Sequence, residues 1–207
     1  MRTAGNNPKS LQKQVDLGWI SKDIAVHLSG LNPAPEGGAM EKNEQSVQKS
    51  FEVLCQITRA QHFAWREAVA SCCSESIPQD VVIEMWRITG QQTAQSYLKH
   101  MDKTSASASL PEQVARSIVW SSRSMGEDAA FEEDKDGVAM VRHSGCPWYD
   151  WHQRLGLLSE DQPGCDAWFG AIVEEINQAR GSQLKFETVS SLPEGDSSCL
   201  RRFWVAQ

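Results

Sequence analysis

Three cysteines in the C-terminal half of the chain stand at positions where a thiol can do chemistry. The first, Cys146, is followed by Pro147, which suits the first turn of a helix because its missing N–H is not needed there. Cys146 is therefore predicted to cap a helix N-terminus, where unbonded N–H groups carry partial positive charge. Such a position lowers the pKa of a thiol and favours the thiolate. The sequence predicts that Cys146 is a nucleophile.

The other two cysteines also fall at predicted element ends. Cys165 stands before an amphipathic helix expected to run to about Ala179, and Cys199 follows a turn at the start of the last predicted strand. Three thiols in such settings predict convergence on one site. A free cysteine is also among the residue types most often buried, so each thiol taken singly fits a structural role equally well. Their spacing matches no paired CxxC zinc motif.

Acid–base groups lie close to these thiols in the sequence. His143 precedes Cys146 by three residues, and His152 follows it by six. Asp166 directly follows Cys165. Imidazoles and carboxylates are the side chains that most often move protons in catalysis. We expect His152 and Asp166 to be acid–base groups, and His143 to lie beside the substrate.

Cations and aromatic rings complete the predicted site. Trp148 and Tyr149 stand in the first turn of the same predicted helix and are expected to contact substrate, although such rings more often belong to a core. An anionic substrate group would need a cation, and Arg142, Arg201 and Arg202 are available on predicted strands. Arg201 and Arg202 face opposite sides of an alternating strand, so at most one points into a given pocket. We take Arg201 as the substrate-binding cation.

A small sheet with helices is predicted to hold these residues. Three segments, at residues 137–142, 184–189 and 199–205, have the composition and alternation of strands. Two helical segments interrupt them, at 148–155 and 169–179. The predicted class is α+β, with a helical N-terminal half packed on a small, mainly antiparallel sheet and two helices in the C-terminal half.

The N-terminal half is predicted to be helical. Apolar residues recur every three or four positions over residues 11–28, 47–72 and 78–97. After a polar linker at 102–109, Ser109 and Glu112 form a capping box that opens a fourth helix.

Length and composition limit the classes of protein to consider. The chain has 207 residues, of which 40% are hydrophobic and 23% charged, as in a globular protein. We expect one domain over residues 1–207, with a helical part at 1–125 and an α+β part at 126–207. A net charge of −7 argues against nucleic acid or an anionic membrane as partner.

The start of the chain has no apolar run typical of a signal peptide, and no segment approaches the roughly 18 apolar residues of a membrane span. The expected location is the cytoplasm, where thiols stay reduced. The six cysteines are therefore predicted to be buried residues, metal ligands or reactive thiols, and not disulfides.

The order of these motifs resembles the L-2-amino-thiazoline-4-carboxylic acid hydrolase family. The resemblance covers residues 126–205 and rests on three elements. They are a Cys-Pro-Trp motif at 146–148, a middle cysteine beside an acidic residue at 165–166, and a closing Glu-Gly-x-x-x-Cys-x-x-x-Phe motif at 194–203. The closing motif is the most specific of the three.

The resemblance implies hydrolytic opening of a thiazoline ring. Water adds at the amidine carbon, the C–S bond breaks, and N-carbamoyl-cysteine results. In this scheme Cys146 attacks the carbon, with Cys165 and Cys199 beside it. Alternatively, the three thiols with a carboxylate or histidine could hold zinc and activate water. The expected partner is a small-molecule substrate and the expected cofactor none, with zinc as the alternative. Assembly into a homo-oligomer is left open.

Two other functions remain open at this point. A biosynthetic tailoring enzyme on the same scaffold would position a reactive substrate for cyclisation or rearrangement, and the tryptophans would then matter more than the thiols. The cysteine-rich half is also similar to small-molecule sensor domains of the vinyl-reductase type, in which cysteines and a carboxylate bind zinc structurally. Metal content would distinguish the binding module from the enzymes.

Overall fold

The computed structural model describes residues 40–73, 75, 77–104, 108–133 and 137–206. The chain separates into two compact units, residues 1–67 and 68–207, which are described one at a time. The expectation of a single domain therefore stays a prediction. The helix predicted at 11–28 lies outside the described residues.

The described part of the first unit belongs to one helix. Helix α3 (Met40–Cys72) confirms the helical period of the segment at 47–72. The apolar stripe predicted there is not buried, however, because Val47, Leu54 and Trp65 are all exposed. The repeat in the sequence revealed that the segment is a helix but not which of its faces is covered.

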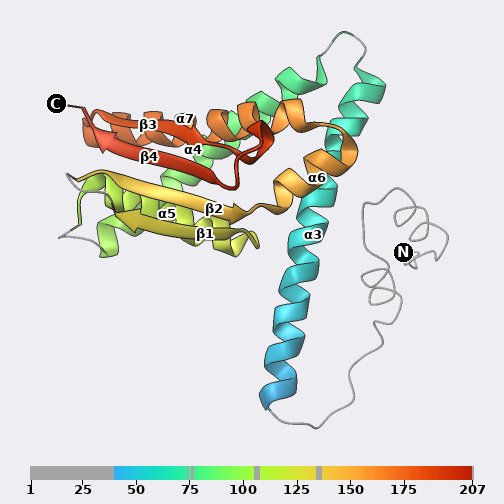
Figure 1. Ribbon diagram of the computed structural model, residues 1–207, viewed down its shortest axis with the longest axis horizontal. Coiled ribbons are helices and arrows are strands. Elements are labelled where there is room, and N and C mark those ends of the chain that lie inside the picture. Colours follow the sequence, from blue (N-terminus) through green and yellow to red (C-terminus); the bar gives the residue numbers. More distant parts are fainter. Residues whose placement is uncertain (1–39, 74, 76, 105–107, 134–136, 207) are drawn as a thin grey trace, which may run out of the picture. The chain divides into compact units, whose positions relative to one another are not determined.

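The second unit is an α+β fold, as predicted (Figure 1). Its helices are α4 (Pro78–Thr104), α5 (Leu110–Ser124), α6 (Pro147–Leu155) and α7 (Leu158–Arg180), with a short 3₁₀ helix, η1 (Leu192–Glu194). Its strands are β1 (Asp128–Glu133), β2 (Ala139–Gly145), β3 (Leu184–Ser190) and β4 (Cys199–Val205). They form one antiparallel sheet in the order β1-β2-β4-β3.

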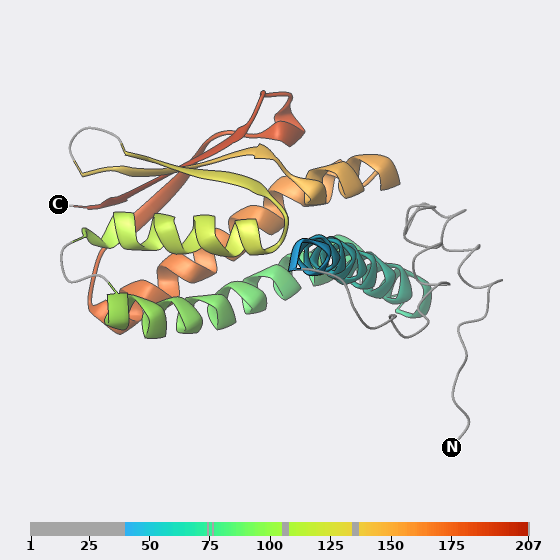
Figure 2. The same ribbon diagram turned by 90° about the horizontal axis from the view of Figure 1, so that it is seen from below.

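Helices cover one face of the sheet and leave the other half-buried or exposed. Helix α5 packs on β1, β2 and β4, and α7 packs on β3 (Figure 2). Alternate residues of β2 and β4 are buried beneath them, including Val141 and Phe203. Phe203 packs with Phe169 and Phe186. The period of two in the sequence of β4 thus corresponds to one covered face.

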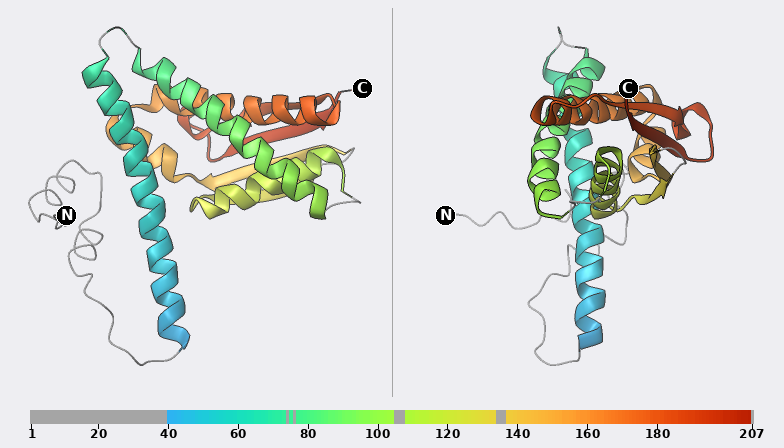
Figure 3. Two further views of the ribbon diagram at one scale, coloured as in Figure 1. Left: turned by 180° about the vertical axis from the view of Figure 1, so that it is seen from behind. Right: turned by 90° about the vertical axis from the view of Figure 1, so that its left-hand side faces the viewer.

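Two glycines allow helix α4 to approach α7 closely (Figure 3). A Cβ atom on Gly90 would lie 2.5 Å from the carbonyl oxygen of Trp168, and one on Gly164 would lie 2.7 Å from the indole of Trp86. Both distances are shorter than real Cβ contacts allow. The absence of a side chain at Gly90 therefore lets the two helix backbones come close, and its absence at Gly164 makes room for the indole of Trp86.

The structure differs from the predicted elements in three places. Strand β1 was not predicted, because residues 128–133 show no alternation and form a strand only by pairing with β2. The linker at 102–109 is shorter than expected, since α4 extends to Thr104. Ser109 does cap α5, and its hydroxyl accepts a hydrogen bond from the Glu112 N–H.

Helix α7 begins at Leu158, well before the start near residue 166 that the sequence suggested. Pro163 lies inside the helix. A proline there leaves the carbonyl four residues earlier without its helical N–H. That carbonyl belongs to Ser159, and the side-chain amide of Gln79 on α4 donates to it at 3.3 Å. A neighbouring helix therefore supplies the missing donor.

No helix in the described ranges is long and apolar enough to cross a membrane.

Candidate active site

A cavity of about 350 Å³ opens in the second unit between the covered face of the sheet and helices α4 to α7. The three cysteines singled out from the sequence, Cys146, Cys165 and Cys199, all line it. His143, His152, Trp148 and Arg201 line it as well. The convergence expected from the positions of the three thiols is therefore seen.

Two strands and a helix start carry one side of the cavity. His143 on β2 and Cys199 on β4 are paired across the two strands, and Arg201 lies two residues further along β4. All three side chains are on the face that the helices cover. Strand β2 then runs directly into Cys146, which caps α6. The pleat and the antiparallel register thus place these residues together.

Cys146 occupies the predicted N-cap position, but its thiol is not activated in the way expected. Burial raises the pKa of the Cys146 thiol to about 12, and the carboxylates of Glu127 and Asp161 add to the rise. Backbone N–H groups of Tyr149 and Trp148 act in the opposite direction and only partly offset it. The prediction of a lowered pKa was therefore wrong, because loss of water outweighs the helix terminus.

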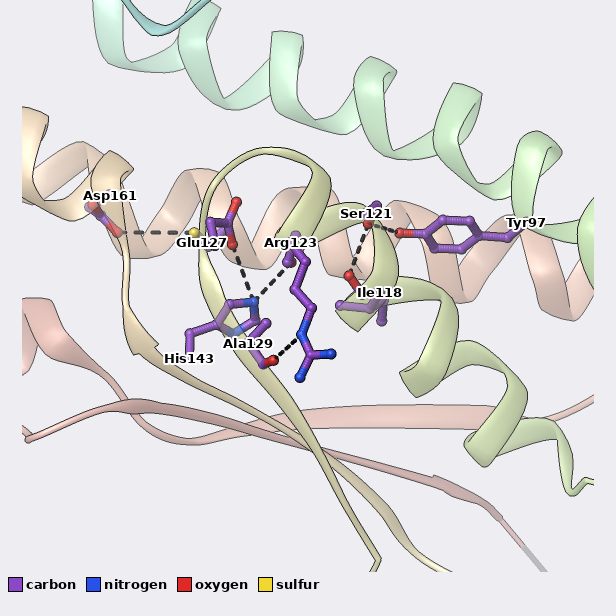
Figure 4. Close-up of polar contacts among 10 residues, drawn as sticks. Tyr97, Ile118, Ser121, Arg123, Glu127, Ala129, His143 and Asp161 are labelled. Carbon is purple, nitrogen blue, oxygen red and sulfur yellow. Dashed lines mark hydrogen bonds and ion pairs between the residues drawn. The ribbon is translucent and has the colours of Figure 1, made fainter. Parts of the chain in front are cut away.

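Cys165 lies inside α7 and not at a helix start. Burial raises its pKa well above the ordinary value, although the guanidinium of Arg201 acts to lower it. The Cys165 thiol lies 4.0 Å from Oδ1 of Asp161, one helical turn earlier (Figure 4). The expectation of an end-of-helix thiol fails because α7 starts earlier, yet the side chain still lines the cavity.

His152 and Asp161 form a buried pair on adjoining helices. Nδ1 of His152 lies 3.0 Å from Oδ2 of Asp161 and 2.9 Å from the carbonyl oxygen of Trp148. The hydrogen bond of Nδ1 runs to the Trp148 carbonyl, whereas Oδ2 of Asp161 has no hydrogen-bond partner among the described residues. A carbonyl oxygen can only accept, so Nδ1 carries the proton and Nε2 is the nitrogen able to accept another. Both side chains are at most 4% exposed. The Trp148 carbonyl therefore orients the imidazole, and Asp161 places a carboxylate beside it.

A second histidine–carboxylate pair lies at the end of β2. Nε2 of His143 is 3.3 Å from Oε2 of Glu127 and 2.9 Å from the hydroxyl of Ser122 (Figure 4). Nδ1 of His143 is buried and has no hydrogen-bond partner among the described residues. Glu127 and Ser122 both line the cavity. The cavity therefore contains two imidazole–carboxylate pairs.

Arg201 is a buried cation on the cavity wall. Only 2% of the residue is exposed, and its guanidinium lies 4.4 Å from the ring centre of Phe169. Burial acts to lower its pKa, but the neighbouring Cys165 and Cys199 raise it, and the net shift is upward. Nε and Nη2 are buried and lack hydrogen-bond partners within the described part of the chain. Arg201 therefore retains donors that an anionic ligand could fill.

The remaining residues predicted for the site do not line the cavity. Asp166 accepts hydrogen bonds at 2.8 Å from both Gln162 and Thr188, beside β3. Tyr149 contributes its backbone N–H near Cys146, but its side chain is not part of the cavity wall.

The two alternative arginines are engaged elsewhere. Arg142 binds Glu132 at 2.6 Å, and Arg202 binds Glu187 at 2.9 Å. Both carboxylates belong to neighbouring strands, β1 and β3. Arg201 is therefore the arginine that reaches the cavity, in agreement with the alternation of β4.

Asp161 and Glu127 were missed by the sequence analysis. Asp161 belongs to the first turn of α7, and the start of that helix at Leu158 was not predicted. Gly156 is the signal in the sequence that could have revealed this early start. It ends α6 in the left-handed backbone conformation, and only Leu157 separates it from α7. Glu127 directly precedes β1. Because that strand was not predicted, no sequence pattern pointed to Glu127 as a site residue.

The described residues contain no preformed metal site. No group of three or more His, Cys, Asp or Glu side chains is arranged there to hold a metal ion. The zinc alternative therefore stays a prediction.

Comparison with solved structures concerns the fold alone. A trafficking protein particle complex subunit 3 from Naegleria fowleri, covalently bound to palmitic acid, matches with a TM-score of 0.50 and 11% identity, over 75% of this chain and 97% of that one. The phenol-responsive sensory domain of the transcription activator PoxR with phenol has a TM-score of 0.44 and 12% identity, over 70% and 73%. An H-NOX protein from S. oneidensis in the Fe(II)NO state has a TM-score of 0.42 and 11% identity, over 97% and 98%.

The sequence itself identifies the family. No curated protein matches the chain. The family model for L-2-amino-thiazoline-4-carboxylic acid hydrolase matches residues 52–203, which extends the similarity well beyond the C-terminal motifs and includes α4, α5 and the whole cavity. The chain therefore belongs to the L-2-amino-thiazoline-4-carboxylic acid hydrolase family.

Proposed function

We propose that this protein is a hydrolase that opens the sulfur-containing ring of a small carboxylate substrate, with Cys146 as the nucleophile. One observation carries the proposal: the guanidinium of Arg201, buried and with unfilled donors, lies on the wall of the same cavity as the thiol of Cys146. A cavity that holds a cation for a carboxylate beside a nucleophile suits a thiazoline carboxylate.

Arg201 supplies the binding half of the mechanism. A carboxylate that accepts hydrogen bonds from Nε and Nη2 would fill both donors and neutralise the buried charge. Guanidinium and carboxylate fit each other through two parallel hydrogen bonds, which fixes the orientation of the ring as well as its position. The reacting carbon would then be held in one place relative to Cys146.

Cys146 supplies the covalent half of the mechanism. Its sulfur adds to the amidine carbon as its proton passes to a neighbouring base. The bond from that carbon to the ring sulfur then breaks, and the ring sulfur takes that proton back from the base and leaves as a thiol. Water adds to the resulting isothiourea carbon. Expulsion of Cys146 with a proton gives the urea, so that one water molecule is consumed and the thiol is regenerated.

Proton transfer is required because the Cys146 thiol is neutral at physiological pH. Its pKa of about 12 means that attack must be coupled to loss of the proton. His152 suits this role, since the Trp148 carbonyl holds the proton on Nδ1 and leaves Nε2 as the accepting nitrogen, with the carboxylate of Asp161 close enough to stabilise the imidazolium. Return of the proton from His152 would assist departure of the ring sulfur.

The proposal is tested by following formation of the N-carbamoyl product from 2-aminothiazoline-4-carboxylate by chromatography. We expect wild-type protein to open the ring and Cys146→Ala to lose at least about a thousandfold in kcat/KM. Cys72→Ala, which removes an exposed thiol outside the cavity, is the matched control and should keep full activity. Intact-mass analysis of a quenched reaction should show the substrate-derived adduct on wild type and not on Cys146→Ala.

Two results would overturn these assignments separately. Full activity of Cys146→Ala would exclude Cys146 as the nucleophile. Absence of ring opening by folded wild-type protein would exclude the hydrolase activity itself.

A further inference from the structure

We propose that the natural substrate of this cavity carries an aryl or similarly large apolar group in addition to its carboxylate, so that it is larger than aminothiazoline carboxylate itself. This inference rests on the proposed function for the identity of the reacting end. It concerns the substituent on the ring carbon between nitrogen and sulfur, which the ring-opening chemistry does not determine.

The first support is the size of the cavity. At about 350 Å³ it falls within the range of pockets that enclose drug-sized ligands. At a liquid volume of about 30 Å³ each, it corresponds to roughly twelve water molecules. A five-membered ring with one amino and one carboxylate substituent would leave much of that space to water. Water held against apolar walls is unfavourable, so a ligand that displaces it gains affinity.

The second support is the chemistry of the walls. Trp86 and Trp148 both line the cavity and meet edge to face, with ring centres 5.1 Å apart and planes at 87°. Trp168 and Phe169 line it too, with ring centres 4.8 Å apart. Gly164 allows Trp86 its close approach to α7. Aromatic rings in this arrangement offer both edges and faces to a further ring.

The third support is that three hydroxyl groups on α4 and α5 are already used within their own helices. Thr89 and Thr93 donate to carbonyl oxygens one turn earlier, at 2.8 Å each. Ser124 likewise donates to the carbonyl of Trp120 at 2.9 Å. These residues line the cavity, yet their donors are bonded to backbone oxygens. At these three positions the cavity wall is therefore less polar than its composition suggests.

The charged groups of the lining come from the strands and from α6 and α7. Arg201, His143 and Glu127 come from β4, β2 and the residues before β1, and His152 and Asp161 come from α6 and α7. The cavity thus combines charged groups with aromatic walls. A ligand that fits both has a polar head, which the proposed function identifies as the ring and its carboxylate, and an apolar tail.

Trp120 indicates where the tail meets solvent. It lines the cavity, yet it is 70% exposed, and its ring stacks on that of His100 at 6.4 Å between centres. A large apolar side chain left in water at a pocket wall is covered when a ligand extends past it. Trp120 is therefore the residue expected to contact the outer end of an aryl group.

The experiment measures binding, without turnover, on the Cys146→Ala variant. Three ligands are titrated by calorimetry: 2-aminothiazoline-4-carboxylate, 2-phenylthiazoline-4-carboxylate, and the carboxamide of the phenyl compound. We expect the phenyl carboxylate to bind at least about tenfold more tightly than the amino compound, because the added ring is buried against aromatic walls. The carboxamide should bind more weakly than the phenyl carboxylate, because it carries no charge for Arg201.

Two further variants test where in the cavity the phenyl group binds. Adding Trp120→Ala should weaken binding of the phenyl carboxylate several-fold and leave the amino compound unchanged. The matched control is Trp204→Ala, which removes an indole from the opposite face of the sheet and should change neither affinity.

The outcomes separate this inference from the proposed function. Equal or weaker binding of the phenyl carboxylate would overturn the inference, even if wild type hydrolyses the amino compound. A phenyl preference without hydrolysis of either compound by wild type would support the inference and overturn the proposed function. A phenyl preference that Trp120→Ala and Trp204→Ala reduce equally would overturn the placement at Trp120.

Discussion

Arg201 and Arg202 are consecutive residues of β4, yet they lie in opposite environments. Arg202 faces the open side of the sheet, where Glu187 on β3 neutralises it at 2.9 Å and both side chains are more than 40% exposed. Arg201 faces the helices, is 2% exposed, and keeps two nitrogens without hydrogen-bond partners in the described structure. On the open face, Arg202 is paired within the protein. On the covered face, Arg201 keeps donors that no described residue fills.

The same contrast holds for the neighbouring strand. On β2, Arg142 faces outward and binds Glu132, whereas His143 faces inward beside Glu127 and Ser122. An exposed ion pair contributes little to folding, because water already solvates both charges. A buried cation with unfilled donors lowers stability unless something binds it. The proposed function accounts for this difference between the faces, because it assigns a ligand to the covered one.

The largest expected effect comes from exchanging the two arginines for methionine one at a time. Arg201→Met should reduce kcat/KM for the carboxylate substrate by about a hundredfold or more, because truncating a buried charge partner removes its hydrogen bonds to the ligand. The thermal midpoint of the unliganded variant should stay the same or rise, since a buried unpaired charge is replaced by an apolar chain of similar length. Arg202→Met should leave kcat/KM within about twofold.

Steady-state kinetics and thermal unfolding of both variants check this contrast. Equal losses of activity in Arg201→Met and Arg202→Met would remove the distinction between the faces. A large loss of stability in Arg201→Met would show that the guanidinium is structural and not reserved for a ligand.

The second effect is a loss of stability at alkaline pH that originates on the covered side. Burial raises the pKa values of Cys146, Cys165 and Tyr97 in the folded protein. For Cys146 the rise is from 9.0 to about 12. The unfolded chain therefore releases the proton first, and the stabilisation is complete below pH 9 and lost as pH rises toward 12. Within that window the free energy of unfolding should fall by about 1.4 kcal/mol per pH unit for this thiol.

Urea unfolding at about pH 7.5 and about pH 10.5 measures this effect, with Cys146→Ala as the comparison. The variant should show a smaller decrease than wild type over the same interval. An identical decrease in both would mean that the Cys146 thiol is more accessible to water than the structure indicates.

The smallest effect is expected on the open face. Removing the Arg142–Glu132 pair by Glu132→Gln should change the free energy of unfolding at neutral pH by about 0–1 kcal/mol, because both side chains are roughly one-third exposed. The hydrogen bond from Arg142 lowers the pKa of Glu132, so its small contribution is present above the unfolded pKa and disappears as pH falls. Urea unfolding at neutral and acidic pH checks both points. A loss as large as that of a core truncation would contradict the assignment of this face as solvent-screened.

Parts of the site followed directly from the sequence. Alternation in β4 placed Arg201 and Arg202 on opposite sides, and Pro147 placed Cys146 at the start of a helix. Both predictions rest on local geometry that a few residues specify, namely the pleat of a strand and the φ angle of proline. Strand β4 itself was predicted with its observed bounds.

Other parts depended on contacts between distant segments. Asp161 lies beside His152 only because α7 begins at Leu158. That helix contains Pro163, and the side-chain amide of Gln79 on α4 donates to the Ser159 carbonyl that the proline leaves without a helical N–H. Strand β1 exists through its pairing with β2, and Glu127 reaches His143 from the residue before that strand. No local pattern in the sequence encodes these partners.

The sequence by itself determined the α+β class, the family, the three thiols and the arginine that shares their cavity. It did so because periodicity, helix caps and motif spacing are properties of neighbouring residues. Only the tertiary structure decided the raised pKa of Cys146, the carboxylates that contribute to it and the helix-internal bonding of the Thr89 and Thr93 hydroxyls. A pKa depends on how much water and which charges surround a group, and those surroundings are assembled from segments far apart in the chain.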